Sequence, residues 1–128
     1  PAHSSSPQAF VIDSTGELAT WMIHADAVIM GKSFLHTGGQ NPAEAIIARK
    51  PLILGPHMDN FQPLVRHLFD AGGVLPAHDS RSITLAIRSA LDPGIAKILV
   101  EKACDVLSLY EGATGRHLRV LQPLHEHA

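Results

Sequence analysis

Short runs of consecutive apolar residues alternate along this chain with segments whose apolar positions follow a helical period. The runs indicate strands that are buried on both faces, as parallel strands are, and they lie at 9–12, 27–31, 51–55 and 74–75. The periodic segments indicate helices at 16–24, 41–48, 64–71, 80–91, 95–111 and 115–124. This alternation predicts an α/β fold with a parallel sheet of about four strands, flanked by helices.

Residues that cap free N–H groups mark the expected helix starts. Ser14 with Glu17 three residues later predicts a capping box, and Ser80 is the expected cap of the helix at 80–91. In the first helix, the spacing of Leu18, Trp21 and Met22 predicts one buried face. The pairs Gly72-Gly73 and Pro93-Gly94 predict helix ends.

Three polar clusters follow predicted strands, at 13–17, 31–44 and 55–57. Ligands of parallel α/β sheets bind where the strands end, so we expect the clusters to converge there. In the second cluster, Gly38-Gly39 allow a sharp turn and close approach to a ligand, and Asn41-Pro42 suit the start of a helix. The N–H groups and positive dipole end of that helix favour a phosphate. We therefore predict an anion and nucleotide cradle at 38–44.

Composition restricts the possible functions. The chain is 45% apolar, is only 17% charged and has a formal net charge of −2, without any run of basic residues. These values predict a globular domain that does not bind nucleic acid, and the low charge hints that another surface covers part of it. The single Cys104 excludes an internal disulfide framework and suggests a reducing compartment. The nine histidines lack metal-site spacing, so we expect neither a metal nor a cofactor.

The ends of the sequence also carry expectations. Residues 1–8 are rich in Pro and Ser and read as a disordered lead-in, which leaves 9–128 as part of a nucleotide-sugar-binding domain. The chain begins with Pro instead of Met, so we expect a fragment or a processed product. No signal peptide or membrane-spanning run is visible.

Six motifs in order make the chain similar to a known family. They are Asp13-Ser-Thr-Gly-Glu-Leu18, Ala25-Asp26-Ala-Val, Gly31-Lys-Ser-Phe, Gly38-Gly-Gln-Asn-Pro-Ala-Glu44, Lys50-Pro51 and Gly55-Pro-His-Met-Asp-Asn-Phe61. Together they resemble the C-terminal half of Kdo transferase, the 3-deoxy-D-manno-octulosonic acid transferase of lipopolysaccharide assembly. This family has the two-domain GT-B glycosyltransferase fold, with a Rossmann-like C-terminal domain.

The resemblance implies a function and a set of site residues. The family transfers Kdo from CMP-Kdo to a lipid A precursor on the cytoplasmic face of the bacterial inner membrane, and its C-terminal domain holds the donor. The positions that match its CMP-contacting segments are Thr15, Gly16, Glu17, Asn41, Pro42, Ala43 and Glu44. Further candidate contacts are Lys32, Gly38, Gly39, Gln40 and His57.

Some of the family's features are absent from this sequence. The resemblance places the general base, a Glu, and the acceptor site in an N-terminal domain, and a Pro-Arg segment that contacts CMP precedes the matched stretch. We therefore expect a donor-binding domain without catalytic residues that is inactive alone. The strands that usually precede 27–31 in such sheets are also missing, and an incomplete sheet edge favours self-association.

Other interpretations of the same residues stay open. Glu17 and Glu44 occupy positions where a carboxylate can cap its own helix, and His57 can simply hold its loop. At the level of function, the alternatives are a GT-B transferase that uses a UDP- or GDP-sugar and a non-catalytic domain that binds a nucleotide or another protein.

Overall fold

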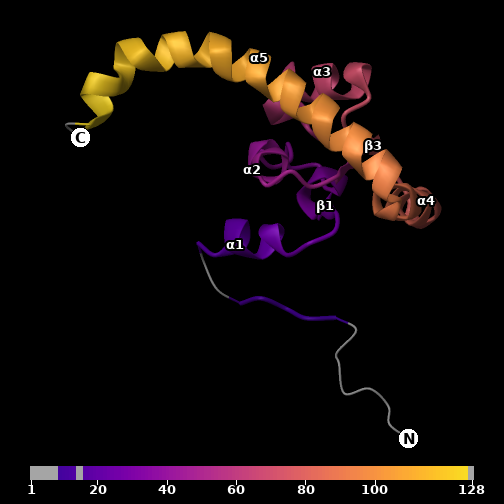
Figure 1. Cartoon of the computed structure of the whole chain (residues 1–128). Coiled ribbons are helices and arrows are strands. Elements are labelled where there is room, and N and C mark those ends of the chain that lie inside the picture. The colour runs from indigo at the N-terminus through magenta and orange to yellow at the C-terminus, as the bar shows by residue number, and fades with distance from the viewer. Residues whose placement is uncertain (1–8, 14–15, 127–128) are drawn as a thin grey trace, which may run out of the picture.

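The computed structural model describes residues 9–13 and 16–126, and the side chains of these residues as far as Tyr110. The elements follow one another in the order α1 (Leu18–Ile23), β1 (Val28–Met30), η1 (Gly31–Phe34), α2 (Ala43–Ile47), β2 (Leu52–Leu54), η2 (Asp59–Phe61), α3 (Leu64–Ala71), β3 (Leu75–Pro76), α4 (Ser80–Leu91) and α5 (Pro93–Glu126), where η1 and η2 are 3-10 helices (Figure 1). This sequence of elements confirms the α/β class.

The sheet is parallel and has three strands in the order β1-β2-β3. Ile29 lies opposite Ile53, and Ile53 lies opposite Leu75. Three of the four predicted strands are therefore confirmed, each within two residues of its expected bounds. The central β2 is buried at all three positions, as the continuous apolar run predicted.

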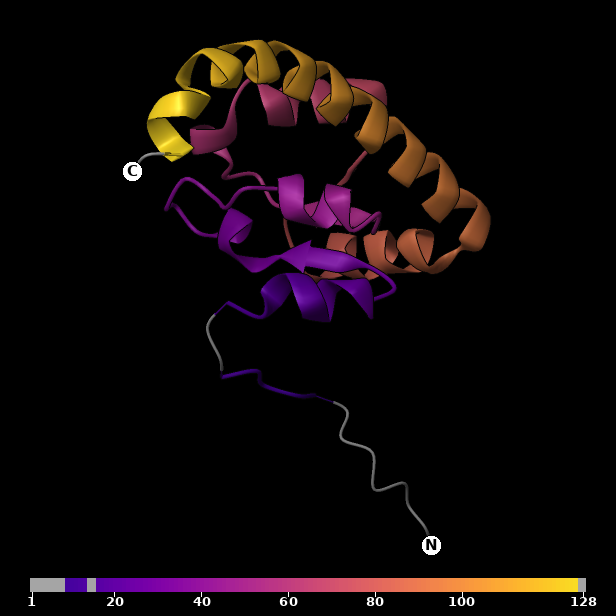
Figure 2. The same ribbon diagram turned by 60° about the vertical axis from the view of Figure 1, so that its left-hand side comes forward.

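The fourth predicted strand, at 9–12, does not form among the described residues. Phe10, Val11 and Ile12 are exposed and make no ladder with the sheet. Figure 2 shows 9–13 as an extended segment that lies apart from the sheet, beyond α1. An apolar run becomes a strand only when a neighbouring strand accepts its hydrogen bonds, and β1 pairs only with β2 in the described part of the chain.

Helices cover both faces of the sheet. Successive strand residues point to opposite faces. Leu52 and Leu54 share one buried cluster with residues of α1, α2, α3 and α5, whereas Ile53 packs with Ala86 and Ala90 of α4. The long helix α5 contacts α2, α3 and α4, and it runs across the molecule in Figure 1. Within the described residues, no helix is long and apolar enough to cross a membrane.

The first helix is shorter and more exposed than predicted. Of the three residues expected on its buried face, only Met22 is buried, and the side chains of Leu18 and Trp21 are about half exposed (48% and 44%). The predicted cap Ser14 lies outside the described residues, and Glu17 makes no side-chain cap hydrogen bond. Helix α1 packs mainly against α2, and its outer face is left exposed to solvent.

Two other helix boundaries correct the sequence prediction. Helix α4 starts at Ser80 as expected, but the capping residue is Asp79: its carboxylate accepts from the Ser82 N–H at 2.8 Å, and the Ser82 hydroxyl accepts from the Asp79 N–H at 3.0 Å. The hydrogen bond from the Ser82 N–H lowers the pKa of Asp79. The two helices expected at 95–111 and 115–124 are one continuous helix, because an interior Gly such as Gly115 costs only about 1 kcal/mol and does not stop a helix.

The glycine and proline pairs at 72–73 and 93–94 mark the ends of helices in the structure as well. Gly72 ends α3 in the left-handed conformation (φ 73°), which confirms the predicted stop. Helix α4 ends at Leu91, which confirms the end predicted from Pro93-Gly94. Pro93 also opens α5, where its missing N–H costs nothing. The carboxylate of Asp92 accepts from the N–H groups of Gly94 and Ile95 and so caps this helix.

Candidate functional site

The second and third polar clusters meet at the carboxyl end of the sheet, and Ser33 joins them. Its hydroxyl donates to the carbonyl of Met30, at the end of β1, and accepts from the N–H of Gly55, after β2, at 2.7 Å. Its own carbonyl accepts from the N–H of His57 at 2.8 Å. Since Ser33 is completely buried, this predicted convergence is fixed from inside the protein.

The glycine turn packs against the loop that follows β2. Gly38 and Gly39 both have positive φ (88° and 86°), where residues with a Cβ are strained. A Cβ at Gly38 would overlap the side chain of Asn60, and one at Gly39 would lie 2.9 Å from the His57 carbonyl oxygen and overlap the Met58 sulfur. The glycines therefore provide the predicted sharp turn, but the close approach that they permit is to the protein's own loop.

Helix α2 begins at Ala43, two residues after the expected start at 41. Pro42 occupies the N-cap position and is buried, and the Asn41 carboxamide oxygen accepts from the N–H of Ala43 at 3.0 Å. The predicted N-cap at Asn41 is therefore off by one residue, although the Asn41 side chain still accepts from an N–H of the first turn. Glu44 is exposed in the first turn, and its carboxylate forms no hydrogen bond or ion pair with any described residue. The alternative role of Glu44 as a helix cap is therefore wrong in this structure.

The other candidate residues are placed less firmly. Lys32, on η1, and Gln40, beside the glycine turn, are exposed. Gly16 has φ 84°, and a Cβ added there would meet no atom within 4 Å. Glu17 precedes α1, which contacts α2. Thr15 lies outside the described residues. The structure thus interlocks the loops at 31–44 and 55–61. It places 16–17 directly before α1.

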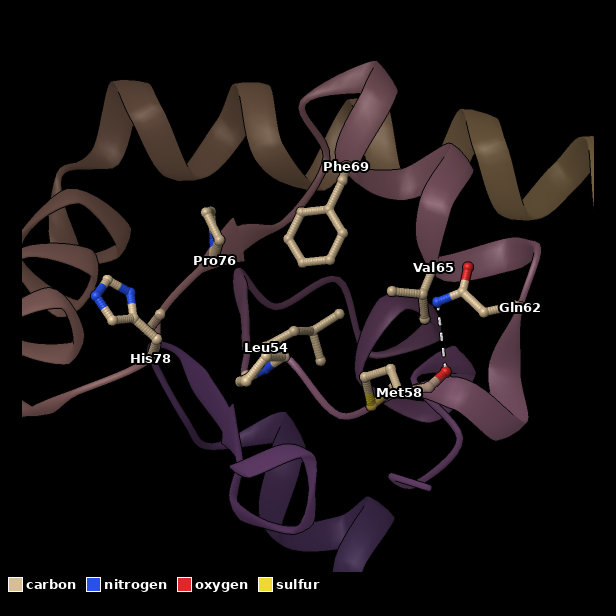
Figure 3. A pocket seen from close by; sticks show the side chains of 10 residues that line it. Leu54, Met58, Gln62, Val65, Phe69, Pro76 and His78 are labelled. Carbon is tan, nitrogen blue, oxygen red and sulfur yellow. Dashed lines mark hydrogen bonds between the residues drawn. The ribbon is translucent and has the colours of Figure 1, made fainter. Parts of the chain in front are cut away.

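A pocket that sequence reasoning missed opens beside the third cluster. It encloses about 370 Å³ between α3 and the ends of β2 and β3, and Figure 3 shows Leu54, Met58, Val65, Phe69 and Pro76 around it. Its lining is mainly apolar, with His78 and Gln62 as polar members; the Gln62 amide donates to the Met58 carbonyl at 3.4 Å. The only sequence signal was that these residues follow two adjacent strands.

Two histidines from different loops also meet here. The ring centroids of His36 and His57 lie 3.8 Å apart, and the ring planes are inclined at 49°. Within the described residues, no three His, Cys, Asp or Glu side chains are grouped to hold a metal ion. The chemistry available at this end of the sheet is thus hydrogen bonding and charge, from a free carboxylate, an ammonium group, two imidazoles and backbone N–H groups.

A parallel sheet between helix layers, with polar loops gathered where its strands end, defines a Rossmann-like domain of the kind that GT-B glycosyltransferases use. Comparison with known proteins gives a more specific likeness within this class. The chain is 36% identical over 111 residues to the 3-deoxy-D-manno-octulosonic acid transferase of Bordetella pertussis and 30% identical over 122 residues to that of Haemophilus influenzae. These alignments cover 86% and 94% of the chain but only 26% and 29% of the relatives. No protein-family model matches the chain.

A solved structure agrees with the sequence relatives. It is the C-terminal CMP-Kdo binding domain of WaaA from Acinetobacter baumannii, which matches with a TM-score of 0.71 and 32% identity over 75% of this chain and 51% of that one. The chain is therefore homologous to the C-terminal domain of Kdo transferases, as its motifs indicated. It spans about a quarter of the length of the curated relatives and about half of the solved domain.

Proposed function

We propose that this chain binds the donor CMP-Kdo in a Kdo transferase, and that the intact protein transfers Kdo to a lipid A precursor in lipopolysaccharide biosynthesis. The observation that carries the proposal is the likeness in fold and sequence to a domain that is named for CMP-Kdo binding. The intact protein would act at the cytoplasmic face of the inner membrane, where its acceptor lies.

The geometry supports distinct roles for the site residues. Glu44 projects from the first turn of α2 with an unpaired carboxylate, which can accept two hydrogen bonds from the vicinal hydroxyls of a ribose. The turn that holds it, Asn41-Pro42-Ala43, is fixed by the hydrogen bond to the Asn41 side chain and by the buried Pro42. Lys32 supplies a charge for the single phosphate, and Thr15-Gly16-Glu17 form the second CMP contact. The turn before α2 is formed by Gly38, Gly39 and Gln40, which are further candidate contacts for CMP.

Catalysis by this chain alone is not part of the proposal. The general base is expected in another domain, and none of the residues assigned here has the role of abstracting a proton from the acceptor. We therefore expect no Kdo transfer when the chain is mixed with CMP-Kdo and acceptor. Measurable transfer would show that the chain itself supplies a base.

The proposal is tested by calorimetric titration of CMP, UMP and GMP into the purified chain. We expect CMP to bind best, and Glu44→Gln to weaken it roughly tenfold, because a neutral amide replaces the carboxylate that accepts both ribose hydroxyls. Glu101→Gln is the matched control, since Glu101 is an exposed carboxylate on α5 at the opposite end of the sheet.

The titration also separates the alternatives. Preference for UMP or GMP would favour a GT-B transferase with another sugar nucleotide. Absence of binding to all three nucleotides at millimolar concentration would contradict donor binding by this chain.

A further inference from the structure

The contact between His36 and His57 joins two loops at the carboxyl end of the sheet. His36 lies between η1 and the glycine turn, and His57 follows β2. The position of His57 is set by its backbone, because its N–H donates to the buried Ser33 and its carbonyl packs under Gly39. The two imidazoles are therefore held beside the turn that leads into α2.

Both rings keep their hydrogen-bonding capacity. Neither imidazole forms a hydrogen bond or an ion pair with any residue that the structure describes, although the side chain of His57 is partly buried. By contrast, His67 on α3 meets the Tyr110 hydroxyl at 2.8 Å. The pair at 36 and 57 thus has donors that the fold does not use.

The proposed donor has an acidic group that the assigned residues do not pair. CMP-Kdo joins a nucleoside monophosphate to an octulosonic acid, so it carries a carboxylate besides its phosphate. Glu44 and the turn at Asn41 face the nucleotide in the proposed function, and Lys32 faces the phosphate. An imidazole N–H, neutral or protonated, is a good donor to a carboxylate.

The charged side chains around the two histidines leave the imidazole N–H groups available for an anionic ligand. On the elements that adjoin the two histidines, the charged side chains are Lys32 on η1, Asp59 on η2 and Glu44 on α2, and all three are exposed. Glu44 is assigned to the ribose in the proposed function and forms no ion pair with either histidine in the described structure. Asp59 forms no ion pair with either histidine among the described residues, so it does not occupy their donors. The ammonium group of Lys32 adds to the attraction for an anion.

We propose that His36 and His57 together bind the carboxylate of the donor's sugar acid and so make the site select CMP-Kdo over CMP. This proposal rests on the proposed function, because it presumes that the nucleotide occupies the neighbouring turn. His36 and His57 are specificity-determining residues in this account and take no proton from the acceptor.

The test compares two ligands that differ by the sugar acid. CMP and CMP-Kdo are titrated separately into the wild-type chain and into His36→Phe, His57→Phe and the double variant. Phenylalanine keeps an aromatic ring in contact with its neighbour but removes both ring nitrogens. His24→Phe, an exposed imidazole between α1 and the amino end of β1, is the matched control.

We expect the wild type and His24→Phe to bind CMP-Kdo at least about tenfold more tightly than CMP, and the double variant to lose this ratio while its affinity for CMP is unchanged. A ratio that survives in the double variant would overturn the assignment. Equal loss of CMP and CMP-Kdo binding in the ring variants would also overturn it, since it would show that the pair only supports the loop. Failure of the wild type to bind CMP would instead refute the proposed function, and this inference with it.

Discussion

The central strand and the β1 edge strand of the small sheet differ in how far one face of the sheet is covered. Ile53 on β2 and Ile29 on β1 lie opposite each other in the ladder and point to the same face, yet Ile53 is fully buried and Ile29 is 42% exposed. Helix α4 covers Ile53, whereas Ile29 does not belong to the cluster beneath that helix. Helix α1, next to β1, is likewise exposed at Leu18 and Trp21.

Different parts of the molecule therefore provide most of its stability and its candidate binding groups. The least exposed residues belong to β2 and to the helices that pack on it, α2, α3, α4 and α5, so the free energy of burial is concentrated there. The candidate donor residues lie on the loops that follow β1 and β2 and on the first turn of α2. Such loops can present unpaired polar groups because a rigid scaffold holds their ends.

The comparison is tested most strongly by removing the same side-chain atoms on each strand. We expect Ile53→Ala to lower the free energy of unfolding by about 2 to 5 kcal/mol, because it leaves a cavity beneath α4. Ile29→Ala is the matched control and should cost less than about 1 kcal/mol, since its side chain already meets solvent. Urea denaturation followed by circular dichroism measures both. Equal losses would mean that the free side of β1 is covered in solution.

Gly39 and Gly16 have similar positive φ angles, but Gly39 packs against another loop and Gly16 does not. Gly39→Ala should lower stability by about 2 to 3 kcal/mol, because positive φ is strained for Ala and the new Cβ meets Met58 and the His57 carbonyl. Gly16→Ala has the same kind of φ but empty space around it, so the expected loss is only about 1 kcal/mol. The melting temperatures of the two variants, compared with that of the wild type, measure the two losses of stability. A Gly39→Ala melt that matches the Gly16→Ala melt would contradict the packing of the turn on the loop.

The smallest expected effect concerns association through the free side of β1. An unpaired strand edge with exposed apolar residues favours pairing with a second copy of the chain. We expect the sedimentation coefficient to rise with protein concentration, and Ile29→Lys to suppress this rise by placing a charge beside the strand. Leu109→Lys, an equally apolar exposed position on α5, should leave it unchanged. A coefficient independent of concentration in the wild type would show that the edge does not self-associate.

The sequence predicted those elements whose signals are local. The runs at β2 and β3 and the periodic segment of α3 were found because burial on both faces or on one face leaves a direct pattern in the residues. The run at 9–12 has the same pattern but no strand beside it, and strand formation depends on a partner that a local pattern does not contain. The continuity of α5 through Gly115 was missed for a related reason, since one unfavourable residue is outweighed by a long helix.

The site was predicted in outline and not in its contacts. The order of strands indicated that 31–44 and 55–57 would meet, and Ser33 confirms it. That Gly38 and Gly39 pack on Asn60 and Met58, and that His36 meets His57, depends on loop conformations that residue spacing does not determine. The roles of the individual site residues remain predictions for binding experiments.

The position of α5 has a consequence for the order of folding. Ala103, Val106 and Leu107 of this last helix belong to the same buried cluster as Met30, Ile46 and Leu54, which lie far earlier in the chain. A polypeptide that has emerged only as far as α4 therefore has its largest apolar cluster uncovered on one side. Closing that cluster requires contacts of high sequence separation, which form slowly. We infer that docking of α5 completes the cooperative unit and that earlier intermediates expose apolar surface to chaperones or to one another.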